Sequence, residues 1–94
     1  MLGGGGPDPD PVAAPSGLTA SNNGTVKGKV QIGLGWSAGA ATVDIYRNGS
    51  KIRSATANTG SYTDAIKVRG SGTLTYKVCN AGSTDCSANA TVNY

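Results

Sequence analysis

The 94-residue sequence predicts an all-β fold, a seven-stranded antiparallel β-sandwich. Serine, threonine, glycine and asparagine dominate it, whereas leucine is scarce and glutamate is absent, and this composition disfavours helices. Short runs carry an apolar residue at every second position, which is the period of a strand with one buried face. Clusters of glycine, asparagine and serine separate these runs at intervals of about ten residues, as in sandwiches.

The first two strands differ in strength. Residues 18–20 predict a short edge strand, and residues 21–24, Ser-Asn-Asn-Gly, predict the turn that ends it. Residues 30–36 alternate strictly, with Gly33 and Gly35 on the face opposite to the core, where a bulge or a close neighbour is expected. The large side chains of this run are expected in the core: Val30, Ile32, Leu34 and Trp36.

The next two strands are expected to form a hairpin. Residues 42–47 predict a strand with Ile45 facing inward and Tyr46 facing outward. Asn48-Gly49 follows, a strong signal for a type I′ turn, because both central residues of that turn need a positive φ. Residues 51–55 should then pair back onto the preceding strand.

Three strands complete the predicted sandwich, at residues 62–68, 74–78 and 88–94. Tyr76 and Val78 are expected in the core, with the Tyr76 hydroxyl bonded to the backbone of the preceding turn as a tyrosine corner. Alternation from Val78 sends Cys79 outward, whereas alternation back from Val92 sends Cys86 inward. A bulge near either cysteine would reconcile the two faces.

Residues 1–14 predict a flexible linker, and residues 15–94 predict the folded domain. The linker is rich in glycine, proline and aspartate and holds too little apolar bulk to offset the entropy of ordering it. We expect it to join the domain to an upstream part of a longer exported chain. In that setting Cys79 and Cys86 are expected to form a structural disulfide rather than two free thiols.

The composition argues against catalysis, metals and cofactors. Without histidine or glutamate, the chain lacks the usual general base, and two cysteines are too few for zinc. Asp44 and Asp64 are possible neighbours, but they are expected to be ordinary surface or turn residues. The positive charges are expected to be scattered on a solvated surface, so neither a nucleic-acid nor a membrane partner is predicted, and we expect a monomer. Tyr46 and Arg47 are the candidate surface-binding residues, with a solvated cross-strand pair as the alternative.

Three segments, taken in order, resemble fibronectin type III domains. Residues 30–36 resemble the second strand of that family, residues 43–49 the third strand and its turn, and residues 72–78 the sixth strand with its tyrosine. Residues 45–49, 61–64 and 76–79, followed by Cys86-Ser87, resemble C-terminal modules of secreted bacterial hydrolases, most closely those on subtilisin-like serine peptidases. This resemblance implies an immunoglobulin-like sandwich and no universal binding site.

The resemblance thus suggests a non-catalytic accessory module of a secreted bacterial peptidase. Such a module would be joined by the linker to an upstream catalytic domain, and it would contribute contact with protein substrate, spacing or stability. Two alternatives remain open, a carbohydrate-binding module of a chitinase-like glycosidase and a passive spacer. The five aromatic residues of the chain are few for a carbohydrate platform, because Trp36, Tyr62 and Tyr76 are expected in the core.

Overall fold

The computed structural model describes residues 13–94, which form seven strands and no helix. The strands are β1 (Ser16–Val26), β2 (Lys29–Ser37), β3 (Thr42–Arg47), β4 (Ser50–Ala57), β5 (Ser61–Ile66), β6 (Thr73–Asn80) and β7 (Ala90–Asn93). Of the predicted flexible linker, residues 1–14, the first twelve lie outside the described residues, and the carbonyl of Ala13 accepts a hydrogen bond from Asn80. At the expected domain boundary, Pro15 is fully buried.

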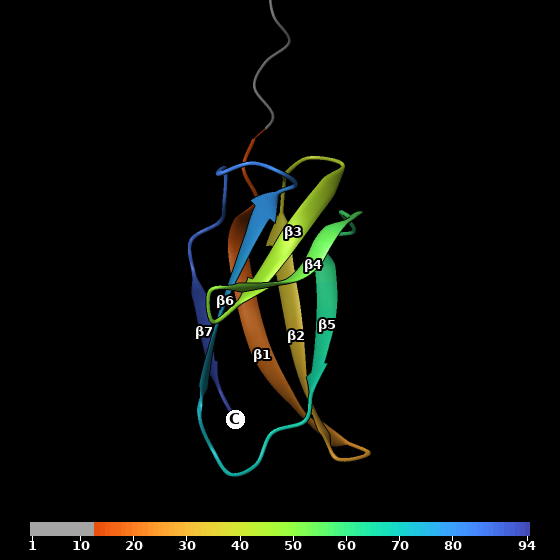
Figure 1. Cartoon of the computed structure of the whole chain (residues 1–94), viewed down its shortest axis with the longest axis vertical. Helices are drawn as coiled ribbons and strands as arrows, with labels where there is room; N and C mark the ends of the chain where they lie inside the picture. The colour runs from red at the N-terminus through yellow and green to blue at the C-terminus, as the bar shows by residue number, and fades with distance from the viewer. Residues whose placement is uncertain (1–12) are drawn as a thin grey trace, which may run out of the picture.

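The strands form two antiparallel sheets packed face to face, as predicted (Figure 1). One sheet has the order β1-β2-β5 and the other has the order β4-β3-β6-β7. The chain enters the domain at one end, and the β1–β2 turn and the β5–β6 loop lie at the opposite end (Figure 1). The two sheets together enclose a single apolar layer.

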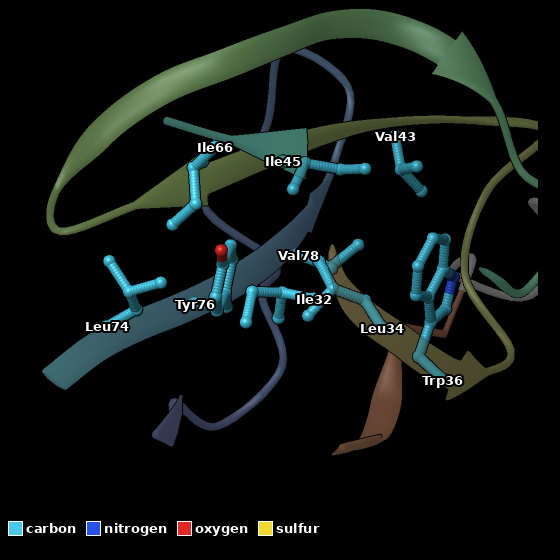
Figure 2. Close-up of a cluster of buried hydrophobic side chains, with 9 residues drawn as sticks. All are labelled: Ile32, Leu34, Trp36, Val43, Ile45, Ile66, Leu74, Tyr76 and Val78. Atoms are coloured by element: carbon cyan, nitrogen blue, oxygen red, sulfur yellow. The ribbon is translucent and has the colours of Figure 1, made fainter. Parts of the chain in front are cut away.

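Figure 2 shows this core, which confirms the predicted alternation. Six of the seven predicted core residues are buried, and Val30 is partly buried against them. Val43, Ile66 and Leu74 complete the cluster. Large side chains at every second position of β2, β3 and β6 therefore bury one face of each strand.

The predicted turn at residues 21–24 is wrong. β1 continues through this segment, and a register shift between Asn22 and Thr25 accommodates one extra residue as a bulge. The hairpin turns instead at Lys27-Gly28, where both residues have positive φ angles of 52° and 80°. The Asn23 side chain of the bulge lies over Gly33: a Cβ there would come within 2.6 Å of the Asn23 amide nitrogen, so this exposed side chain would have to move aside.

A bulge also settles the conflict between the cysteines. Tyr76 pairs with Ala90, and Cys79 lies opposite Cys86. Between these two pairs β6 has two residues and the returning chain has three, so the register shifts by one. Because of this shift both cysteines lie on the same face of the sheet, where they form the expected disulfide.

Candidate functional site

The two residues predicted to bind at the surface lie on opposite faces of β3. Tyr46 faces outward, in register with Lys51 on β4 and Lys77 on β6. The ammonium groups of Lys51 and Lys77 lie 5.9 Å and 4.9 Å from the centre of its ring, within range of a cation–π interaction. Arg47 points the other way, toward the interior at the end of the strand. A combined Tyr46–Arg47 site is therefore not formed, and a binding role for Tyr46 stays a prediction.

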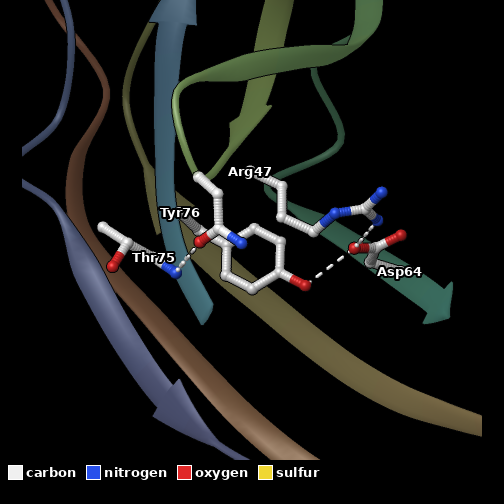
Figure 3. Close-up of polar contacts among 5 residues, drawn as sticks. Arg47, Asp64, Thr75 and Tyr76 are labelled. Carbon is white, nitrogen blue, oxygen red and sulfur yellow. Dashed lines mark hydrogen bonds and ion pairs between the residues drawn. The ribbon is translucent and has the colours of Figure 1, made fainter. Parts of the chain in front are cut away.

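Arg47 belongs instead to a polar network that links the two sheets (Figure 3). Its Nη1 donates to Asp64 Oδ2 at 2.7 Å, and the Tyr76 hydroxyl donates to the same oxygen at 2.7 Å. Asp64 lies on β5, whereas Arg47 and Tyr76 are paired on β3 and β6. Asp64 and Tyr76 are 5% and 0% exposed, so water screens their contact little.

The network corrects two expectations from the sequence. The Tyr76 hydroxyl bonds the carboxylate of Asp64 rather than the backbone of a turn, so it forms no tyrosine corner. Asp64 is a buried partner and not a surface residue. Burial and the hydrogen bond to Asp64 raise the pKa of Tyr76, and the hydrogen bond to Asp64 raises the pKa of Arg47. The hydroxyl is thus held neutral as a donor, which does not suit a general base.

Asp44 is buried as well, although alternation places it on the outer face of β3. It accepts hydrogen bonds from the backbone nitrogens of Ala55 at 2.7 Å and Gly82 at 3.1 Å, and Lys51 lies 3.4 Å away. These two amides, followed by Lys51, hold the pKa of Asp44 below its usual value. Ser54 and Ala55 form a bulge of β4 opposite Asp44. The Asp44 carboxylate therefore holds this bulge and the β6–β7 loop against β3, and it does not lie beside Asp64.

Two asparagines organise the end of the domain where the chain enters. Asn58 accepts from Trp36 Nε1 at 2.9 Å, and its amide donates to the carbonyls of Ala38 and Ala40. Asn80 accepts from the nitrogen of Ala40 and donates to a carbonyl of residue 13 at 3.2 Å. These hydrogen bonds tie the loops at this end of the domain to one another and to the chain where it enters.

Within residues 13–94 no group of three or more metal-ligating side chains comes together. Residues 13–94 form strands and contain no helix that is long and apolar enough to cross a membrane. The aspartates whose chemistry was open, Asp44 and Asp64, both serve as hydrogen-bond acceptors within the fold.

The sequence reasoning missed the roles of the buried residues Asp44, Asp64 and Asn80 and of the partly buried Asn58. Alternation gave one usable signal, because it places Arg47 on the inward face with Val43 and Ile45. A charged residue there needs a buried partner of opposite sign. The partner itself lies 17 positions away on the other sheet, which no local pattern indicates.

Comparison with known proteins gives one informative similarity. No protein-family model matches the chain, and no solved structure matches it. Among curated proteins, it is similar to a poly(3-hydroxybutyrate) depolymerase of Delftia acidovorans, with 38% identity over 61 residues. The aligned part covers 65% of this chain and 12% of the depolymerase. The similarity is thus to a small part of a much longer protein.

Proposed function

We propose that the chain is a non-catalytic accessory module of a secreted hydrolase that acts on a polymer. The observation that carries this proposal is the similarity to a depolymerase. The aligned part covers only 12% of the length of that protein. The absence of histidine and glutamate from the sequence supports a role other than catalysis. The disulfide between Cys79 and Cys86 supports an oxidising, extracellular setting.

The module is of the fibronectin type III kind in this proposal. Seven strands divided into three and four, with β4 beside β3 and β7 beside β6, support that assignment. So do the segments of β2, β3 and β6 that resemble the family.

The parent enzyme is better sought among polyester depolymerases than among peptidases. The resemblance to modules of subtilisin-like peptidases has no counterpart in the comparisons, whereas the depolymerase matches at 38% identity. A peptidase parent remains the second candidate, because accessory modules move between catalytic domains and their likeness does not specify the substrate.

A carbohydrate-binding role is disfavoured by the placement of the aromatic side chains. Trp36 and Tyr76 are buried, and Tyr62 and Tyr94 pack against the core. Tyr46 then remains as the single ring available on an outer face, and its sides are taken by two lysines. A flat platform of several rings is therefore missing from residues 13–94.

The test uses the full-length enzyme that carries this module. In one variant the module is deleted, and in another it is replaced by a glycine-serine linker of matched span. Both are assayed on an insoluble polyester film and on a small soluble ester. Substrate contact predicts that both variants lose rate on the film and keep their rate on the soluble ester, because tethering raises the local enzyme concentration only at a surface. Recovery by the linker variant would leave spacing as the function, and equal rates on both substrates would contradict substrate contact.

A further inference from the structure

Exposed positively charged side chains lie at the end of the domain that holds the β1–β2 turn and the β5–β6 loop, opposite to the end where the chain enters. Lys27 lies in the turn between β1 and β2, Lys29 begins β2, and Lys67 and Arg69 lie in the loop after β5. All four are exposed, and Figure 1 shows both segments at the same end. We call these four residues, together with Arg47, the cationic end.

Within residues 13–94, no ion pair engages Lys27, Lys29, Lys67 or Arg69, whereas Arg47 is paired with Asp64 at 2.7 Å. Of the three aspartates in residues 13–94, Asp44 and Asp64 are buried and hydrogen-bonded, and Asp85 lies in the β6–β7 loop. Val30 and Ile66 form the terminal pair of the β2–β5 ladder. Lys29 comes just before Val30 and Lys67 just after Ile66, so two like charges flank the same end of this ladder. Such an arrangement costs stability and favours an external anion.

A pocket of about 380 Å³ opens at the same end of the sandwich. Arg47 and Lys67 supply its charged side chains, and Val68 and Tyr94 line it beside Ile66 and Leu74, which are largely buried in the core. Arg47 donates a hydrogen bond from Nη1 to Asp64. The guanidinium has further N–H donors, arranged in a fork that matches the geometry of a carboxylate. The pocket thus places cationic N–H donors beside a small apolar surface.

From this combination we infer that the cationic end binds the carboxylate terminus of a short aliphatic chain. The choice of acid rests on the proposed function. Hydrolysis of an ester bond by water forms one carboxylic acid and one hydroxyl, and the acid is ionised at neutral pH. A polyester that has been cleaved therefore presents carboxylate ends, each attached to an aliphatic chain. The module would hold the enzyme on regions that are already being degraded.

The test compares the linear trimer of 3-hydroxybutyrate as free acid with its methyl ester, titrated into the 94-residue chain. Backbone amide shifts are followed by NMR at low ionic strength, where surface charges are screened least. The acid should shift the amides of residues 47–48 and 66–68, and the ester should bind more weakly. Lys67→Gln should raise the Kd for the acid about two- to fivefold, the range of an exposed ion pair. Arg53→Gln, the matched control on β4, should leave it unchanged.

Equal affinity for acid and ester would overturn the inference, as would equal effects of Lys67→Gln and Arg53→Gln. Retention of the chain on intact and pre-hydrolysed polyester films separates polymer ends from free acid. Polymer ends predict greater retention on the pre-hydrolysed film and competition by the trimer. The two proposals can fail separately. If deletion of the module leaves film hydrolysis unchanged while the chain still prefers the acid, the proposed function is refuted and the anion site is kept.

Discussion

Replacing Tyr76 with phenylalanine isolates the hydrogen bond that ties the two sheets together. The ring is fully buried and its packing is retained, so the variant loses only the hydroxyl that donates to Asp64 at 2.7 Å. A buried hydrogen bond to a charged group is worth about 1.5–3 kcal/mol. We expect the free energy of unfolding to fall by that amount, which lowers the Tm by roughly 6–24 °C for a domain of this size.

The assay is equilibrium unfolding in urea and by heat, with Tyr46→Phe as the matched control. Tyr46 is half-buried on the outer face, so loss of its hydroxyl should change stability by no more than about 0.5 kcal/mol. If Tyr76→Phe is as stable as Tyr46→Phe, the network contributes nothing and the reasoning is refuted. An unchanged urea dependence, the m-value, would show that the variant still buries the same surface.

The same bond predicts a loss of stability in alkali. The pKa of Tyr76 is raised in the folded state above its usual value of 10.0, because burial and Asp64 favour the neutral hydroxyl. Above that usual value the unfolded chain releases this proton before the folded chain does. The unfolding free energy should therefore fall as pH rises beyond about 10. Tyr76→Phe should flatten this decline, as measured by urea unfolding at successive pH values.

Three further variants test the rest of the fold. Asp44→Asn should flatten the acid limb of the stability curve, as measured by acid titration with circular dichroism. The lowered pKa of Asp44 gives stability that is present above its usual value of 3.8 and is lost as pH falls through the folded-state pKa. Replacing Cys79 and Cys86 with serine should lower the unfolding free energy by about 2–3 kcal/mol with an unchanged spectrum, and a non-reduced mass equal to that of the dithiol would refute the bond itself. Deleting residues 1–12 should leave the Tm within about two degrees; extending the deletion through Pro15 should lower it further, because that side chain is fully buried.

Period-two alternation determined much of this fold from the sequence. It gave the inward faces of β2, β3 and β6, because a strand projects successive side chains to opposite sides whatever lies around it. Asn48-Gly49 was correctly predicted as a turn, with φ angles of 52° and 84°, because the requirement for positive φ is local to the two residues. The need for a bulge near the cysteines also followed from alternation, though its position did not.

Tertiary structure decided which polar groups are buried and which charges stay exposed. Asp44 lies on an outward-facing position and is nevertheless covered, because the β4 bulge and Gly82 close over it. Asp64 meets Arg47 and Tyr76 only when the two sheets pack. Burial of these two acids removes negative charge from the surface and leaves Lys67 and its neighbours unopposed at one end of the domain. Hydrogen-bond partners across a sandwich are far apart in the chain, so local patterns in the sequence carry no record of them.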